Sequence, residues 1–437
     1  MPPPEPMPRR LDASSPGFAA EFETLLADRE AVTDDVSAVV REILDDVRQR
    51  GDAAILDYTK RFDRLPLDAK GLRFHADDVS RAAGDIPRET MDALELAARR
   101  IEAFHRRQIP ADLGYEDDAG VTLGLIWKPL DSVGLYVPGG RASYPSSVLM
   151  NAIPAKVAGV ARIAMAVPTP DGVVNPLVLA AAKLAGVSEV YRIGGAQAVG
   201  ALAYGTATIA AVDKIVGPGN AYVATAKRMV FGRVGIDSIA GPSEILVVAD
   251  GNNDPDWIAA DLLSQAEHDP DAQSVLISDD AAFIGAVFDA AGRHLEALPK
   301  PDVARASWER HGAGILVRSL AEAVDLVNRL APEHLELAVA DPKALAARIR
   351  HAGAIFLGRH TPEAVGDYVA GPNHVLPTSR TARFSSGLSV FDFLKRTTVV
   401  GCTAEALAEI GPAAIRLAEA EGLPAHGRSV SVRLNRR

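Results

Sequence analysis

From about residue 125 the chain alternates short β-branched runs with alanine-rich segments, and this alternation most constrains its fold. The strand-like runs include "VGLYVP", "RIAMAVP" and "EVYRIGG". The segments between them, such as "SSVLMNAIPAKVAGV" and "NPLVLAAAKLAGV", have the length and composition of buried helices. Strands separated by such helices form parallel sheets that helices cover on both faces. The sequence therefore predicts an α/β fold.

The same alternation resumes after residue 240 with "EILVVAD" and "SVLISDD", and strand-like runs recur at 314–317 and 354–357. A chain of 437 residues also exceeds what one hydrophobic core usually serves. We therefore expect two Rossmann-like parallel-sheet domains, joined near 235–245. Apolar side chains at helical spacing predict a mainly helical first hundred residues, and the chain beyond about 388 predicts a mostly helical tail.

These patterns divide the chain into four regions. An N-terminal arm covers 1–28, and its proline-rich start, "MPPPEPMPRR", predicts an extended or disordered lead-in. The first α/β domain combines 29–134 with 244–387, and the second covers 135–243. Residues 388–437 form the C-terminal tail.

Composition excludes several classes of partner. A net charge of -11 and the lack of a Lys/Arg block argue against nucleic acid. The single cysteine excludes an internal disulfide framework and fits a reducing cytoplasm. The longest uncharged run, at 193–212, is rich in Ala and Gly, so we interpret it as a buried helix plus a strand and not as a membrane span. We expect a cytoplasmic protein with no nucleic-acid or membrane partner.

Two glycine-rich motifs occupy positions where nucleotides often bind. "GGAQAVG" at 194–200 and "VGPGNAYV" at 216–223 each follow a predicted strand and precede a predicted helix. Backbone amides at such a junction can contact a phosphate group. Neither motif has the full G-x-G-x-x-G spacing, so the pattern only suggests a nucleotide site.

Polar residues gather in two places that could form a metal site. Gln265 and His268 lie three apart at the end of the predicted helix in "LLSQAEHDPD", where they are either metal ligands or exposed terminal residues. Asp367 and His374 lie in "VGDYVAGPNHVLPT", whose Gly and Pro residues predict a loop. Asp367 is equally well interpreted as a turn carboxylate that bonds its own backbone.

Three further positions leave their roles open when taken alone. Glu333 and His334, in "APEHLELAV", predict either an acid/base pair or an ordinary helix start after Pro332. Glu421 and His426 flank a Gly-Leu-Pro break between two predicted helices and would be surface residues. Cys402 is expected to be a small buried hydrophobic residue.

The motifs in their order resemble those of the histidinol dehydrogenase family. The resemblance rests on "VGLYVPGG", "YPSSVLMNAIPAKVAGV", "GGAQAVGALAYGT", "VDKIVGPGNAYV", "GIDSIAGPSEILV", "DLLSQAEHDP", "APEHLEL", "GDYVAGPNHVLPT" and "AEGLPAH", and it extends from about residue 15 to the end. It implies a zinc-dependent, NAD-linked oxidation of L-histidinol through histidinaldehyde to L-histidine, the last step of histidine biosynthesis. Two NAD molecules would be reduced per turnover.

The resemblance also implies a metal site and an acid/base pair. One zinc ion per subunit would be held by Gln265, His268, Asp367 and His426, and this mixture of imidazole, carboxylate and amide oxygen suits zinc. His334 would remove the alcohol proton, and Glu333 would activate water for the second oxidation. Cys402 lies in none of the matched site motifs, so no covalent thiol intermediate is expected.

Substrate and cofactor contacts follow from the same resemblance. The substrate would be bound by Ser243, Gln265, His268, His334, Asp367, His374, Glu421 and His426. The NAD site would be lined by Tyr136, Gln197 and Asn220. The family forms homodimers with a swapped C-terminal tail, so Glu421 and His426 would enter the active site of the neighbouring subunit. By this assignment the first α/β domain carries the metal and catalytic residues and the second binds NAD.

Three other functions fit parts of the pattern. The first is a dehydrogenase of the same fold that acts on another small alcohol such as a sulfonated diol, although Glu421 favours a cationic amino group on the substrate. The second is a zinc hydrolase in which Glu333 activates water. The third is a non-catalytic dimeric scaffold held together by metal. Reduction of NAD on addition of substrate separates the dehydrogenases from the other two.

Overall fold

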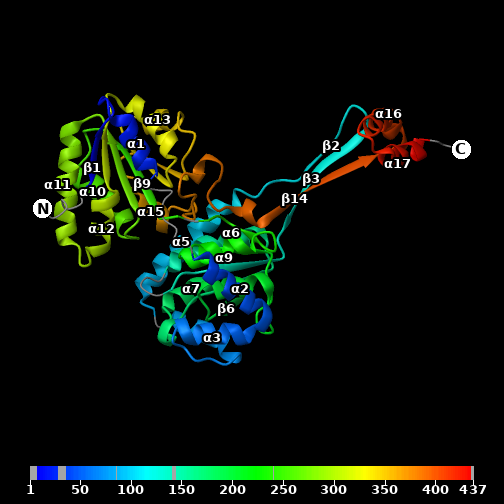
Figure 1. The fold of residues 1–437 in the computed structure, drawn as a ribbon, viewed down its shortest axis with the longest axis horizontal. Helices are drawn as coiled ribbons and strands as arrows, with labels where there is room; N and C mark the ends of the chain where they lie inside the picture. Colours follow the sequence, from blue (N-terminus) through cyan, green and yellow to red (C-terminus); the bar gives the residue numbers. More distant parts are fainter. Residues whose placement is uncertain (1–6, 28–35, 85, 140–143, 240, 435–437) are drawn as a thin grey trace.

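A computed structural model describes residues 7–27, 36–84, 86–139, 144–239 and 241–434. Of the lead-in expected for "MPPPEPMPRR", residues 1–6 lie outside these ranges. The chain forms two parallel sheets with helices on both faces, and a long arm that carries the C-terminus away from them (Figure 1). The predicted α/β class is confirmed.

The first sheet has five parallel strands in the order β6-β5-β4-β7-β8. The strands are β4 (Ser132–Tyr136), β5 (Arg162–Ala166), β6 (Glu189–Tyr191), β7 (Lys214–Val216) and β8 (Gly235–Ile236). Counted along the chain, this order is that of the Rossmann fold, in which the direction of strand addition reverses between the first and fourth strands. Here the reversal lies between β4 and β7.

Local sequence sets the helices of this sheet. They are α6 (Pro145–Ala158) and α7 (Pro176–Ala185) on one face, and α8 (Gly195–Tyr204) and α9 (Ala221–Val230) on the other. Asn175 caps α7, because its side chain accepts a hydrogen bond from Leu177 N at 2.9 Å. Gly159 ends α6 with φ at +94°, a conformation that glycine adopts without strain.

The second sheet has six parallel strands in the order β1-β11-β10-β9-β12-β13. They are β1 (Arg9–Asp12), β9 (Glu244–Ala249), β10 (Gln273–Ser278), β11 (Ala313–Leu316), β12 (His334–Ala338) and β13 (Ala354–Leu357). One face is covered by α10 (Pro255–Ala266), α11 (Ala281–Ala297) and α12 (Asp302–His311). The other is covered by α1 (Phe18–Ala27), α13 (Leu320–Leu330) and α14 (Pro342–Ala346). From β9 onward the strand order repeats that of the first sheet, so both predicted Rossmann-like units are present.

The helices between residues 37 and 106 pack beside the five-stranded sheet. The helices α2 (Ser37–Arg50), α3 (Asp52–Phe62), α4 (Ala76–Gly84) and α5 (Arg88–Arg106) all pack against the helices that cover the five-stranded sheet. The apolar side of α2, with Val40 and Leu44 buried, contacts α8 and α9. The strands β9 to β13 of the expected unit 29–134 with 244–387 belong to the six-stranded sheet. The expected N-terminal arm supplies β1 and α1 to the six-stranded sheet.

The C-terminal tail forms the end of the arm. The strands β14 (Leu394–Cys402), β3 (Val121–Pro129) and β2 (Leu113–Glu116) make an antiparallel sheet in the order β14-β3-β2, and α16 (Ala404–Ala420) and α17 (Pro424–Leu434) lie beyond it (Figure 1). The tail is mostly helical as expected, but it begins with a nine-residue strand. Cys402, expected to be buried, is exposed at the end of β14, a strand in which most residues are exposed.

Short 3-10 helices occur at η1 (Lys70–Leu72), η2 (Pro170–Gly172), η3 (Thr381–Arg383) and η4 (Val390–Phe393). Within the ranges that the structure describes, no helix is both long and apolar enough to cross a membrane.

The carboxyl ends of the five-stranded sheet face the amino ends of the six-stranded sheet. Ser147, in the first turn of the helix that follows β4, lies 3.4 Å from the His374 ring through its hydroxyl. The segment that carries His374 continues to Ser379, whose N–H donates to the side chain of Glu244, the first residue of β9, at 2.8 Å. The two edges therefore enclose the region where the predicted site residues lie.

Candidate active site

Glu333 and His334 are held against Glu244 at the amino ends of β9 and β12. Glu244 N donates to Glu333 Oε2 at 2.9 Å, and Glu333 N donates to Glu244 Oε2 at 3.3 Å. The His334 ring places Nδ1 3.0 Å from Glu244 O. Because a carbonyl oxygen only accepts, Nδ1 carries a proton, and Nε2 is directed away from the β9 strand.

The interpretation of Glu333 and His334 as a helix start is wrong. His334 is the first residue of β12, a central strand paired with both β9 and β13. The sequence "HLELA" is fully buried in the sheet, and Pro332 precedes the strand instead of opening a helix. An extended backbone turns successive side chains to opposite faces, yet both side chains remain buried at this edge.

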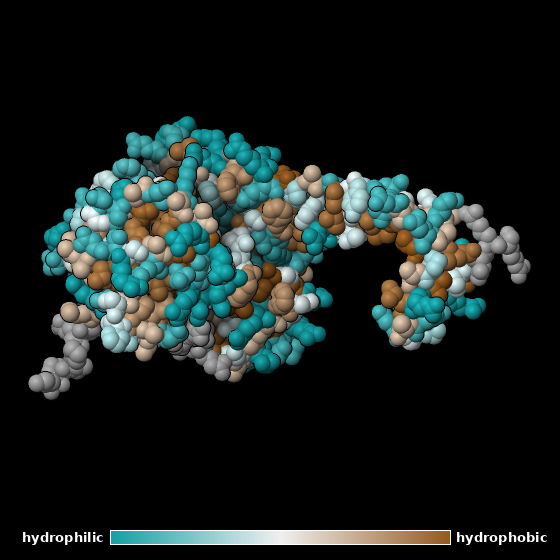
Figure 2. Space-filling view, turned by 90° about the horizontal axis from the view of Figure 1, so that it is seen from above, coloured by the Kyte–Doolittle hydropathy of each residue, from teal (hydrophilic) through white to brown (hydrophobic). Residues whose placement is uncertain are grey.

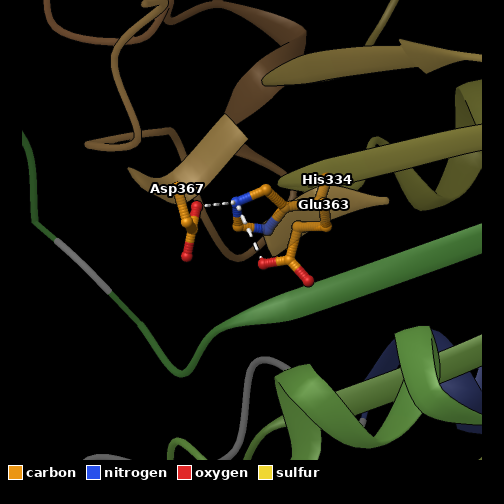
Figure 3. A group of neighbouring side chains, drawn as sticks. All are labelled: His334, Glu363 and Asp367. Carbon is orange, nitrogen blue, oxygen red and sulfur yellow. Dashed lines mark ion pairs between the residues drawn. The ribbon is translucent and has the colours of Figure 1, made fainter. Parts of the chain in front are cut away.

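Two carboxylates face the other nitrogen of His334 (Figure 3). Nε2 lies 3.6 Å from Glu363 Oε1 and 3.6 Å from Asp367 Oδ1, and both residues come from the short helix α15 (Glu363–Tyr368). Ligand atoms of the three residues lie within 4.8 Å of one another. At 3.6 Å these contacts are ion pairs without hydrogen-bond geometry. The three side chains form a compact charged cluster at the domain junction.

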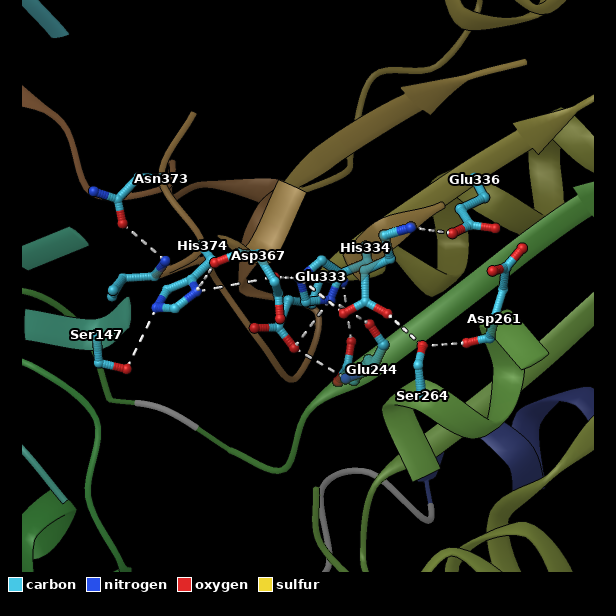
Figure 4. A network of polar contacts seen from close by, with 12 residues as sticks. Ser147, Glu244, Asp261, Ser264, Glu333, His334, Glu336, Asp367, Asn373 and His374 are labelled. Carbon is cyan, nitrogen blue, oxygen red and sulfur yellow. Dashed lines mark hydrogen bonds and ion pairs between the residues drawn. The ribbon is translucent and has the colours of Figure 1, made fainter. Parts of the chain in front are cut away.

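His374 extends this cluster toward the five-stranded sheet (Figure 4). Its Nδ1 lies 3.0 Å from Asp367 O, so Nδ1 donates and Nε2 can accept from the Ser147 hydroxyl. The adjacent Asn373 donates through Nδ2 to Met150 O at 2.6 Å, and Nδ2 also lies 3.4 Å from the buried His105 ring. The segment that runs from Asp367 in α15 to His374 is thereby fixed to helices of the other sheet.

Burial and close charges shift the protonation of these groups. Complete burial raises the pKa of Glu333 to about 8, although the charge of His334 opposes this shift. Burial lowers the pKa of His334, but the carboxylates of Glu333 and Glu363 outweigh it and raise that pKa to about 10. Burial also raises the pKa of Glu363 to about 7 and lowers that of His374. Perturbed groups of this kind cluster at functional sites.

Gln265 and His268 lie at the end of α10, which returns to the same edge of the sheet. Gln265 is buried in the last turn of the helix, and its Oε1 has no hydrogen-bond partner among the described residues. His268 follows the helix and is exposed, and its charge acts on both Asp367 and His374. His268 therefore lies near enough to Asp367 and His374 to influence both, and the same helix end carries a buried Gln265 oxygen without a hydrogen-bond partner among the described residues.

The remaining predicted substrate residues divide between the body and the arm. Ser243 directly precedes Glu244 and is half-buried at the site. Glu421 and His426 are exposed on the arm, at the end of α16 and in α17, well away from α15 in the same chain (Figure 1). One chain alone therefore does not bring these two residues to the His334 cluster.

The three predicted NAD residues lie at the carboxyl ends of the five-stranded sheet. Tyr136 ends β4, and its hydroxyl accepts from Gly195 N at 3.0 Å. Gln197 is buried in α8 with Oε1 unpartnered among the described residues. Asn220 caps α9 by accepting from Val223 N at 3.2 Å. Both glycine-rich motifs join a strand to a helix as predicted, and Tyr136 and Asn220 flank the reversal point where α/β folds bind ligands.

Comparison with known proteins decides the family. The family model described as histidinol dehydrogenase matches residues 26–434. Histidinol dehydrogenase of Rhodospirillum rubrum is 66% identical over 431 residues, covering 98% of this chain and 99% of the relative, and that of Gluconobacter oxydans is 63% identical, covering 98% and 100%. The chain belongs to the histidinol dehydrogenase family.

A solved histidinol dehydrogenase has the same fold. The crystal structure of the enzyme from Elizabethkingia anophelis superimposes with a TM-score of 0.93 at 36% sequence identity, and the match covers 98% of each chain. Membership of the histidinol dehydrogenase family makes the chain an oxidoreductase of histidine biosynthesis.

Sequence reasoning missed several acidic residues of this histidinol dehydrogenase site. Glu363 contacts His334, Glu244 binds Glu333, and Glu336 accepts from Glu363 N at 2.5 Å. Each had a signal in the sequence. Glu244 and Glu336 stand inside apolar strand-like runs, where a charge is costly unless it is paired. Glu363 stands four residues before Asp367, one helical turn away.

Proposed function

We propose that this chain catalyses the zinc-dependent, NAD-linked oxidation of L-histidinol to L-histidine through histidinaldehyde. The observation that carries the proposal is the buried Glu333–His334 pair beside Asp367, where two Rossmann-like sheets meet. A buried acid and base at the edge of a dinucleotide-binding sheet suit removal of a proton as hydride leaves the same carbon.

The residues at the end of α10 and in α15 fit a zinc ion. The buried Oε1 of Gln265 has no hydrogen-bond partner among the described residues, whereas a buried amide oxygen normally has one. Together with the His268 ring and the Asp367 carboxylate, it offers donor types that zinc accepts. Glu363 and His334 are less suitable ligands, because Glu363 also accepts from the Ser264 hydroxyl at 3.4 Å and His334 is held through Nδ1 by Glu244 O. Bound zinc would orient the imidazole and amine of the substrate and polarise its reacting oxygen.

The protein groups then handle protons and water. Oxidation of the alcohol releases one proton and one hydride, and the aldehyde must add water before it can lose a second hydride. His334 is placed to accept the alcohol proton once a cation held by Asp367 offsets the carboxylate charges that raise the pKa of His334. Glu333 is placed to take a proton from water as it adds to the aldehyde. Glu244 holds both side chains through its backbone and is the reason that their positions are fixed.

Tyr136, Gln197 and Asn220 are proposed to line the NAD site. Their position at the reversal between β4 and β7 supports this assignment, as does the unpartnered Oε1 of Gln197. The domain assignment is proposed with it. The five-stranded sheet and its helices bind NAD, and the six-stranded sheet carries the metal and catalytic residues.

A homodimer with shared active sites would complete the site. Glu421 and His426 are exposed on an arm that extends from the body, so they are free to reach a second copy. There Glu421 would pair with the amino group of the substrate and His426 would supply the fourth zinc ligand. We propose one zinc per subunit and a cytoplasmic location.

The test is the yield of reduced cofactor from limiting L-histidinol with excess NAD, on metal-replete and on chelated enzyme. We expect two NAD reduced per histidinol, no reduction after chelation, and recovery on adding zinc. A yield of one would contradict the role of Glu333 in the second oxidation. No reduction with histidinol, but turnover of a sulfonated diol, would move the chain to a different substrate.

A further inference from the structure

Lys227 and Asp237 form a buried ion pair beneath the loop that joins β7 to α9. The two side chains are only 3% and 4% exposed, and the Lys227 ammonium contacts Asp237 Oδ1. Lys227 projects from α9, whereas Asp237 follows β8, so the pair also links a helix to the edge strand of the sheet. Neither side chain is accessible to a substrate.

Both members of the pair also bind the same residue of that loop. Gly217 N donates to Asp237 Oδ2 at 2.7 Å, and Gly217 O accepts from Lys227 Nζ at 3.0 Å. The pair therefore satisfies the donor and the acceptor of one peptide residue at once. The position of Gly217 is therefore fixed through both of its backbone polar groups, the N–H and the C=O.

Gly217 is also constrained from the opposite side. Its φ is +112°, and a Cβ added there would lie 2.1 Å from Tyr136 O. The loop thus passes directly against the end of β4, and three residues later Asn220 caps α9. A shift of Gly217 would displace residues 217–220. This loop carries Asn220 and lies against Tyr136 where the strand order reverses.

A purely stabilising role does not explain this arrangement. Burying two opposite charges costs much of what their attraction returns, and apolar side chains of similar size often stabilise a fold as well or better. What an apolar pair cannot supply is a donor for Gly217 O and an acceptor for Gly217 N. The ion pair therefore serves to hold the Gly217 loop in its position.

We propose that Lys227 and Asp237 are positioning residues that set the affinity for NAD by fixing the Gly217–Asn220 loop against Tyr136. This inference rests on the proposed function, because it takes NAD as the ligand of that loop. It predicts that the pair affects cofactor binding and leaves the chemistry at Glu333 and His334 unchanged.

The decisive variant is the double replacement Lys227→Met with Asp237→Leu, which removes both charges and keeps apolar volume. We expect a lower melting temperature, because Gly217 N and Gly217 O both lose their partners. We also expect a KM for NAD increased about tenfold, with an unchanged KM for histidinol and an unchanged kcat at saturating NAD. A double variant with wild-type KM for NAD overturns the inference.

A second variant and a matched control guard against misfolding. Gly217→Ala keeps both charges but forces the loop away from Tyr136, so it is expected to raise the KM for NAD in the same way. Arg162→Met is the control, since Arg162 pairs with Glu189 at 2.9 Å and binds Ala210 O and Ala211 O at the opposite edge of the same sheet. It should lower the melting temperature without changing the KM for NAD.

Hydrogen exchange separates failure of this inference from failure of the proposed function. In the double variant, amides of 214–223 should exchange faster than in the wild type, and NAD should slow them in the wild type. If the wild type reduces no NAD, the proposed function fails. Equal exchange rates of residues 214–223 in the variant and the wild type would then also overturn the positioning role of Lys227 and Asp237. If the wild type is active but the variants bind NAD normally, only the inference fails.

Discussion

Burial of the Glu333 carboxyl group is expected to determine how the reaction rate depends on pH. The side chain is buried, with only 6% of the residue exposed, and burial raises its pKa to about 8. A raised carboxyl pKa means that the group is protonated below that pH and becomes a base only above it. We therefore expect the rate of NAD reduction to fall as pH decreases through about 8.

Replacing Glu333 by Gln tests this assignment. The amide keeps the size of the side chain but cannot accept a proton, so we expect kcat to fall by about 10²- to 10⁴-fold. The remaining rate should lose its dependence on pH near 8, measured as initial rates between pH 6 and 10. A variant that keeps the wild-type pH profile would contradict the role of Glu333.

Cys402, in contrast to Glu333, is expected to take no part in the reaction. It is exposed at the end of β14, on the arm, and far from His334 in the same chain. We expect Cys402→Ser to oxidise both histidinol and histidinaldehyde at wild-type rates. Loss of the aldehyde step alone would indicate a thiol intermediate and refute the assignment of water addition to Glu333.

At the scale of elements, the arm is the feature that a single chain does not explain. Apolar side chains that would usually be covered are exposed along it, among them Leu417, Val400, Tyr115 and Leu113, and Figure 2 shows hydrophobic residues along the arm and open space between its helical end and the body. Exposed apolar surface of this kind marks interaction sites. A second copy of this chain would cover it and bring His426 to a site.

Subunit mixing tests this exchange. We expect His426→Ala and Asp367→Ala homodimers to be inactive, and a purified heterodimer of the two to regain about half of the wild-type activity, because one of its two sites receives no substitution. A heterodimer of Asp367→Ala with Glu333→Ala is the control and should stay inactive, since both residues belong to the body. An inactive first heterodimer would show that each site is built from one chain.

At the scale of the whole molecule, the alternation of strands and helices was sufficient to predict two parallel-sheet domains and their junction. It did not predict that α2 to α5 pack beside the five-stranded sheet, because an amphipathic helix shows that it has a buried side and not which surface buries it. The sequence also did not predict that β3 pairs with β14. Their pairing joins residues 121–129 to 394–402, and local pattern carries no information on such distant contacts.

The candidate site was predictable in part for similar reasons. Short-range patterns located Gln265 with His268 and Glu333 with His334, but their meaning came from the family resemblance. The pattern in "APEHLELAV" predicted a helix where the structure has a strand, since the apolar run is too short for periodicity to separate the two. Glu244 and Glu363 each had a weak signal in the sequence, but only the fold shows that both lie beside His334.

The pairing of β14 with β3 has a consequence for how the protein is made. During synthesis β2 and β3 emerge early, whereas β14 leaves the ribosome only near the end of the chain, a delay of roughly tens of seconds at ~5–20 residues per second. Through that interval β2 and β3 form an isolated hairpin with an open edge, which is marginally stable and prone to pair with another nascent chain. Ribosome-bound intermediates of this protein should therefore depend on chaperones until their last residues have been added.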